Sequence, residues 1–222
     1  YVILEVLKAL SYAHGASSRD GQPLRIVHRD VGAGNVLLSW SGAVMLADFG
    51  VAKATQRQTR TAAGHIKGNF LYMSPEQVLG QDVDQRTDVY GAGMLLLTAA
   101  TGRHPFEGEP MLRMATRIRG GDVPLPSKLD PGLPRELDDI VGRAIRFAPG
   151  ERYQSAREFA IELAAFARGR GWSHDDVHLA RWLAECRSVE ERPGEAPSIV
   201  NRRAPLIAEA VDLYNTLRLG VS

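Results

Sequence analysis

A nearly uninterrupted apolar run, VYGAGMLLLTAA at 89–100, most strongly limits what this 222-residue chain can fold into. The run is too short for a helix that spans a bilayer, which needs about 20 residues. It is therefore predicted to form a buried core helix over 87–101, and no membrane-spanning segment is expected. Helical spacing of apolar residues predicts four more helices, at 2–14, 109–119, 134–147 and 155–168.

The expected β structure is small. Two strand-like runs, NVLLS at 35–39 and AVMLA at 43–47, are separated by WSG and predict a hairpin. The following residues, 48–68, are polar and without periodicity, which predicts an exposed loop of the length usually found in functional or disordered segments. The expected fold class is therefore α+β, mostly helical, with a small β-hairpin patch.

A shift in composition at ARGRG, 167–171, predicts a boundary between a main domain, 1–168, and a helical C-terminal extension, 169–222. In the extension, Trp182 and Cys186 share one face of a predicted helix. Both are expected to be core residues.

Charge and cysteine content exclude some classes of partner. The 27 basic and 26 acidic residues are well mixed and give a net charge of +1, so no strong field would attract nucleic acid or anionic lipid. One cysteine cannot form an internal disulfide, and no segment resembles a signal peptide. A cytoplasmic location is expected.

The polar stretch IVHRDVGAGNVLL, 26–38, carries the candidate chemistry. Asp30 and Asn35 lie on a turn, and Asp48 follows across the predicted hairpin. If the hairpin folds back, these three side chains converge. Each of them taken singly is best explained as a turn former, but together they supply the oxygen ligands that suit Mg²⁺ beside substrate phosphates. Their joint spacing favours phosphate chemistry.

Four motifs now indicate a family. HRDVGAGN, ADFG, YMSPE and DVYGAG resemble, in order, the catalytic loop, the metal-binding triplet, the end of the activation segment and the start of the core helix of protein kinases. The resemblance covers about residues 1–168, the C-terminal lobe, and is to bacterial serine/threonine kinases of the eukaryotic type. It implies a signalling enzyme that uses ATP and Mg²⁺ on a protein substrate.

The resemblance also implies roles for the site residues. Asp30 would orient the acceptor hydroxyl and accept its proton, with Asn35 completing the catalytic pair. Asn35 and Asp48 would hold the magnesium ions that bridge the transferred phosphoryl group. Leu37 would lie beneath the adenine, and Asp48 would help to bind the nucleotide. His28 is expected to be a packing residue.

Other matched residues would control the activation segment. Arg29, beside the catalytic Asp, would bind a phosphate on the activation loop. The sequence does not choose among three candidate phosphosites, and the loop could instead simply be solvated; the candidates are Thr55, Thr59 and Thr61.

Three more residues would hold the segment in place. Glu76 would form a buried ion pair with Arg152. Asp88 would cap the core helix near Val89 and, by the resemblance, reach the catalytic-loop backbone.

The chain departs from the family at several points. Gly32 stands where serine/threonine kinases usually carry Lys, and Asn69 replaces a usual Thr. Tyrosine kinases usually carry Trp where this chain has Tyr72, so the serine/threonine class is the better match. The glycine loop, strand lysine and partnering glutamate of an N-terminal lobe are absent. Since the chain begins at Tyr1 within a helical pattern, it is expected to be a truncated part of a longer protein and to bind ATP poorly alone.

The favoured function is transfer of the ATP γ-phosphoryl group to a Ser or Thr hydroxyl of a protein. A second hypothesis is a catalytically impaired pseudokinase or scaffold that acts by binding a partner protein. Gly32 and the missing lobe favour it, whereas Asp30, Asn35 and Asp48 argue against it. The third hypothesis is a small-molecule phosphotransferase of related fold. It ranks last because Arg29 and the YMSPE segment would have no role in such an enzyme.

Overall fold

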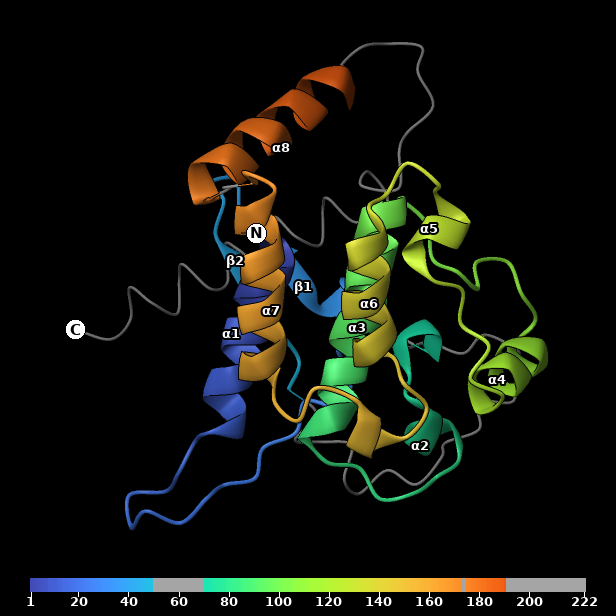
Figure 1. Ribbon diagram of the computed structural model, residues 1–222. Coiled ribbons are helices and arrows are strands. Elements are labelled where there is room, and N and C mark those ends of the chain that lie inside the picture. Colours follow the sequence, from blue (N-terminus) through green and yellow to red (C-terminus); the bar gives the residue numbers. More distant parts are fainter. Residues whose placement is uncertain (50–69, 173–174, 191–222) are drawn as a thin grey trace. The chain divides into compact units, whose positions relative to one another are not determined.

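The computed structural model of the chain describes residues 1–49, 70–172 and 175–190 (Figure 1). Within these ranges the chain is mostly helical and has one two-stranded sheet, as the sequence predicts. The helices are α1 Val2–His14, α2 Pro75–Val78, α3 Gln85–Thr101, α4 Met111–Arg119, α5 Pro126–Leu129, α6 Arg135–Ala144, α7 Ala156–Gly169 and α8 Asp176–Glu190. The strands are β1 Val36–Leu38 and β2 Val44–Leu46, and short 3-10 turns lie at Ala33–Asn35, Phe70–Tyr72 and Pro149–Glu151.

Two compact units make up the chain. The larger contains Val2–Val36 and Leu46–Trp172, and the smaller contains Tyr1, Leu37–Met45 and Ser173–Ser222. The C-terminal part of the smaller unit begins at Ser173, whereas the sequence predicts an extension that begins at residue 169. The tip of the hairpin, Leu37–Met45, is in the same unit as this C-terminal part.

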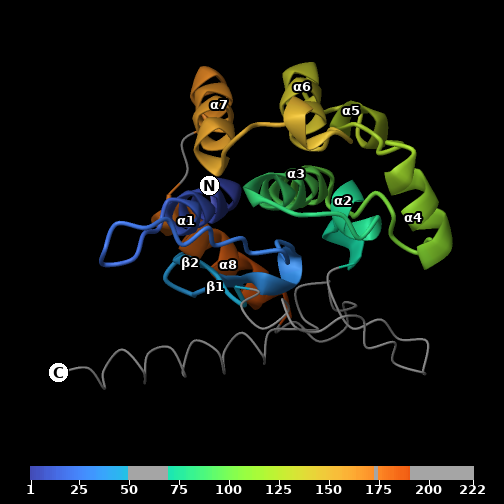
Figure 2. The same ribbon diagram turned by 90° about the horizontal axis from the view of Figure 1, so that it is seen from below.

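Helix α3 is the core of the larger unit. Its residues 87–97 are all buried, as expected for the apolar run. Helices α1, α6 and α7 pack against it, and α7 also packs against α1 and α6. Figure 2 shows α6 and α7 on one side of α1 and α3. Loops that reach α3 are therefore attached to the most buried element of the unit.

The N-terminus of α3 differs from the prediction. The helix begins at Gln85 because the side chain of Asp84 accepts a hydrogen bond from the backbone N–H of Arg86. The prediction that Asp88 caps the helix is wrong, since Asp88 lies within the first turn and is 1% exposed. Its carboxylate is therefore available for another partner.

The described part of the smaller unit consists of the hairpin tip and α8. Leu183 of α8 is buried, and the Arg187 guanidinium lies 5.4 Å from the ring centroid of Trp40. Trp182 is 50% exposed, so the prediction that it is a core residue is wrong, and Cys186 is partly exposed.

Among the described residues, no helix has the length and apolar character needed to cross a membrane.

Candidate active site

The loop that carries Asp30 lies directly on α3. Asp88 accepts hydrogen bonds from the backbone N–H groups of His28, at 2.8 Å, and Arg29, at 2.7 Å. Its Oδ2 also lies 2.8 Å from Nε2 of His14 on α1. Asp88 therefore reaches the backbone of the loop that carries Asp30, as the family resemblance implies, and it does so through main-chain donors that any residue would supply.

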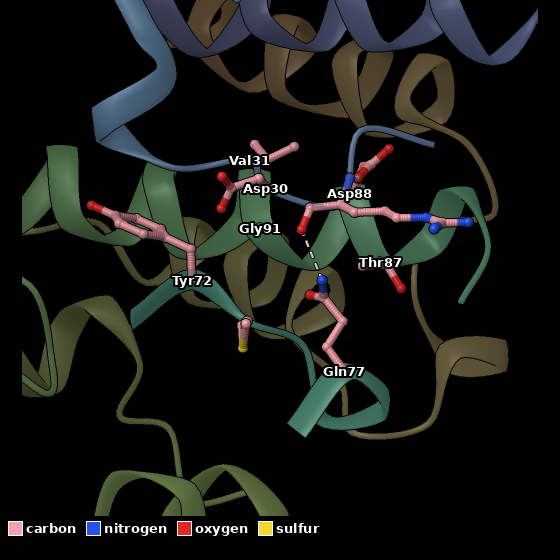
Figure 3. A pocket seen from close by; sticks show the side chains of 9 residues that line it. Asp30, Val31, Tyr72, Gln77, Thr87, Asp88 and Gly91 are labelled. Carbon is pink, nitrogen blue, oxygen red and sulfur yellow. Dashed lines mark hydrogen bonds between the residues drawn. The ribbon is translucent and has the colours of Figure 1, made fainter. Parts of the chain in front are cut away.

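Gly91 allows the loop to approach α3 closely. A Cβ atom at Gly91 would lie 2.9 Å from both the Cβ and the carbonyl oxygen of Val31, so no larger residue fits without movement. Figure 3 shows Asp30, Val31 and Gly91 around a cavity of only about 10 Å³. The residue that follows Asp30 thus packs on the helix backbone.

His28 has a fixed tautomer. Its Nδ1 accepts a hydrogen bond from the backbone N–H of Asp30 at 3.3 Å, so Nε2 carries the proton that is donated to the carbonyl of Ala47 at 2.9 Å. The ring is fully buried, and its centroid lies 4.5 Å from that of Phe49. His28 is a packing residue that joins the loop to the segment before Asp48.

Two hydrogen bonds bring Asn35 and Asp48 to the loop of Asp30. The Asn35 side chain donates from Nδ2 to the carbonyl of Asp30 at 2.7 Å. The backbone N–H of Ala47 donates to the carbonyl of Asn35 at 2.8 Å, and Asp48 is the next residue. Asp48 has a left-handed backbone, with φ of 59°, which is uncommon outside glycine and typical of constrained sites.

These residues fit a magnesium site. Because the Asn35 amide nitrogen is used by Asp30, its oxygen is the atom left for a cation, and Asp48 adds a carboxylate on an exposed residue. No cluster of three or more His, Cys, Asp or Glu that could hold a metal occurs in the described part of the chain. Mg²⁺ needs fewer protein ligands than that, because waters and substrate phosphates complete its shell.

Leu37 and the activation-loop threonines complete the predicted set. Leu37 lies on β1 and is partly exposed. Thr55, Thr59 and Thr61 lie outside the described residues.

Arg29 has a left-handed backbone, with φ of 67°. It lines a cavity of about 710 Å³ together with two other arginines, Arg25 and Arg86. Arg86 is paired with Asp84, which also lines this cavity. The cavity wall is therefore rich in cationic side chains, which suits an anionic group.

Glu76 and Arg152 form the buried ion pair that the sequence predicts. The pair is bidentate, with both N···O distances at 2.7 Å, and Thr87 also donates to Glu76 at 2.6 Å. Arg152 donates further to three carbonyls, those of Arg86, Arg146 and Phe147. Burial alone would raise the pKa of the Glu76 carboxyl, but the bonds from Arg152 and Thr87 outweigh it and hold that pKa below its usual range.

The sequence interpretation missed two residues that contact the predicted site segments, Gln77 at the loop of Asp30 and His104 at Tyr72. Gln77 donates from Nε2 to the carbonyl of Arg29 at 2.8 Å, a bond between residues 48 positions apart (Figure 3). His104 is buried against Tyr72, with ring centroids 5.0 Å apart. The capping-box pattern Ser74-x-x-Gln77 predicts the local role of Gln77, but no local pattern predicts either long-range contact.

Comparison with known families decides the class of protein. The protein kinase domain family matches residues 1–160, which include the catalytic loop, Asp48, the ion pair and α3. The chain belongs to the protein kinase family. The resemblance stated from four short motifs therefore holds over most of the chain.

Bacterial kinases are among its relatives. The chain is 39% identical over 165 residues to tyrosine-protein kinase MasK of Myxococcus xanthus, covering 74% of this chain and 26% of that protein. It is 38% identical over 188 residues to serine/threonine-protein kinase PknL of Mycobacterium tuberculosis, covering 85% and 45%. It is 36% identical over 170 residues to probable serine/threonine-protein kinase PknB of Bifidobacterium longum, covering 76% and 24%. The chain thus spans between a quarter and half of these kinases.

Proposed function

We propose that this chain is part of the catalytic domain of a protein serine/threonine kinase that transfers the γ-phosphoryl group of ATP to a Ser or Thr hydroxyl. The observation that carries the proposal is the pair of hydrogen bonds that joins Asp30, Asn35 and the segment before Asp48. Residues 1–168 would form the C-terminal lobe of that domain. The expected location is the cytoplasm.

In this proposal Asp30 orients the acceptor hydroxyl and takes its proton while the new O–P bond forms and the bond to the departing ADP breaks. Asn35 and Asp48 would hold Mg²⁺, which would supply neutralisation of charge on the phosphates. Asp88 and Gly91 fix the backbone on both sides of Asp30. Catalysis then depends mainly on positioning and on preorganised charge.

Arg29 would bind a phosphate on the activation loop. Its place in an arginine-rich cavity wall supports this role, because a guanidinium binds phosphate through two parallel hydrogen bonds. Thr55, Thr59 and Thr61 remain the candidate carriers. Leu37 would contact the adenine, and the parts that cover the phosphates would come from an N-terminal lobe of the parent protein.

The test is transfer of radiolabelled phosphate by the full-length parent protein to a mixture of bacterial proteins. Asp30→Asn is expected to lower the rate by about 10²–10⁴-fold, because its amide cannot accept the proton. Asp82→Asn, at an exposed position, is the matched control and should leave the rate unchanged. Equal rates in the two variants would contradict the proposal, and no transfer by any form would favour the scaffold hypothesis.

The acceptor class needs its own measurement, because MasK is named a tyrosine kinase. Acid hydrolysis of the labelled proteins is expected to release phosphoserine and phosphothreonine. Label found only in phosphotyrosine would overturn the acceptor class while leaving the kinase activity intact.

A further inference from the structure

Gln77 makes two separate contacts with its side chain. Its Oε1 accepts a hydrogen bond from the backbone N–H of Ser74 at 3.0 Å, while the Ser74 hydroxyl accepts from the N–H of Gln77. These reciprocal bonds form the capping box of α2. Its Nε2 points the other way and donates to the carbonyl of Arg29 at 2.8 Å. The cap and the long-range bond therefore use different atoms of one amide.

The carbonyl of Arg29 belongs to the peptide unit that leads into Asp30. The N–H of the same unit is that of Asp30, which donates to Nδ1 of His28. The preceding unit is held as well, because the N–H of Arg29 donates to Asp88. Gln77 is thus the group that holds the carbonyl side of the Arg29–Asp30 peptide.

That peptide needs to be held. Arg29 has a left-handed backbone, which costs a residue with a side chain about 1–2 kcal/mol and persists only where its surroundings enforce it. A rotation of the Arg29–Asp30 peptide would relax this strain and would turn the Asp30 side chain at the same time. Gln77, Arg29 and Asp30 line the same small cavity (Figure 3).

We infer that Gln77 is a positioning residue for phosphoryl transfer: its amide holds the Arg29–Asp30 peptide and, through it, the direction of the Asp30 carboxylate. The inference rests on the proposed function. Gln77 also joins α2, which begins within the YMSPE segment, to the loop that carries Asp30, so that the order of one depends on the order of the other.

Three variants separate the two contacts. Gln77→Glu keeps the length of the side chain and an oxygen for the Ser74 N–H, since Glu also serves in a capping box, but it removes the donor that faces Arg29. Ser74→Ala removes the cap hydroxyl and leaves that donor in place. Gln85→Glu is the matched control, because Gln85 Nε2 also donates to a backbone carbonyl, that of Gln154, at 2.8 Å.

The first readout is amide hydrogen exchange in the 222-residue chain, which needs no activity. Gln77→Glu is expected to speed exchange at Arg29 and Asp30 about tenfold, the effect of one lost hydrogen bond. Ser74→Ala should speed exchange only in α2, and Gln85→Glu should leave the catalytic loop unchanged. Equal exchange at Asp30 in Gln77→Glu and Gln85→Glu would overturn the inference.

The second readout is steady-state kinetics of the full-length parent. Gln77→Glu is expected to lower kcat about tenfold or more with the KM for ATP unchanged, since misdirection of a reacting group lowers the rate of chemistry. Faster exchange with unchanged kcat would overturn the positioning role. Faster exchange in a parent that transfers no phosphate would leave the contact established and would instead contradict the proposed function.

Discussion

The catalytic loop and the stem of the activation segment are both anchored to the first turn of α3, but by opposite chemistry. Asp88 holds the loop by accepting two main-chain N–H groups. Glu76 holds the stem by accepting a hydrogen bond from Thr87 of α3 and by pairing with the Arg152 side chain. A main-chain anchor does not use the loop side chains, whereas a charge pair makes the stem depend on one distant residue. The loop anchor is therefore independent of the side chains at His28 and Arg29, and the stem anchor is not independent of the side chain at Arg152.

The largest expected effect tests the stem. Arg152→Ala leaves the Glu76 carboxylate buried without its cation and should lower the free energy of unfolding by about 3–5 kcal/mol. Denaturant unfolding of the 222-residue chain measures it. The control is Arg143→Ala, which breaks pairs with Glu158 and Glu162 that are about 40% exposed and should cost about 1 kcal/mol or less. Equal losses in the two variants would remove the contrast between the regions.

A second test of the stem uses pH. Burial lowers the pKa of His104 to about 4, so between that value and its ordinary 6.5 the unfolded chain binds a proton that the folded chain does not. Stability should therefore fall by up to about 3 kcal/mol as pH drops through this window. Melting temperature measured against pH should lose this slope in His104→Asn. His178→Asn, at an exposed position, should keep the slope. A slope that survives in His104→Asn would show that another group causes the pH dependence.

The loop anchor is tested by Asp88→Asn. One carboxylate oxygen becomes an NH₂ group that faces a backbone N–H, so about 2 kcal/mol of stability should be lost. Exchange of the His28 and Arg29 amides should rise with it. Asp84→Asn, four residues earlier, keeps a good helix cap and should change stability by less than about 0.5 kcal/mol. A loss without faster loop exchange would show that Asp88 does not hold the loop.

The smallest expected effect compares two glycines of α3. Gly91→Ala places a Cβ 2.9 Å from Val31, and Gly93→Ala places one 2.7 Å from Ala144 of α6. Both should cost about 1–2 kcal/mol by overpacking. Only Gly91→Ala should also speed amide exchange beside Asp30 and lower kcat of the parent. If Gly93→Ala lowers kcat equally, the loop responds to α3 as a whole and not to its local contact.

Most of the fold could be predicted because it follows local periodicity. The apolar spacing predicts a helix at 2–14, and the structure has it at Val2–His14. The core helix begins at Gln85, but it is predicted to begin at residue 87 because its first turn is polar and carries no apolar period. Two four-residue helices, α2 and α5, were missed because they are too short for a period. The SPEQ pattern, with Pro at the first helical position, could have indicated α2.

In the candidate site, too, local features could be predicted from the sequence and long-range contacts could not. Asp30, Asn35 and Asp48 could be identified because their types and spacing occur together along the chain. The bond from Gln77 to Arg29 and the contact of Gly91 with Val31 could not, because they join segments 48 or more positions apart. Such contacts depend on how α3 packs, which local periodicity does not specify.

The two ring nitrogens of His28 have a consequence for where the acceptor proton goes. One is occupied by the Asp30 amide and the other by the Ala47 carbonyl, and the ring has no contact with solvent. The imidazole nearest to Asp30 in the sequence therefore cannot serve as a relay. In the proposed reaction, a proton taken up by Asp30 would therefore not be passed on by His28.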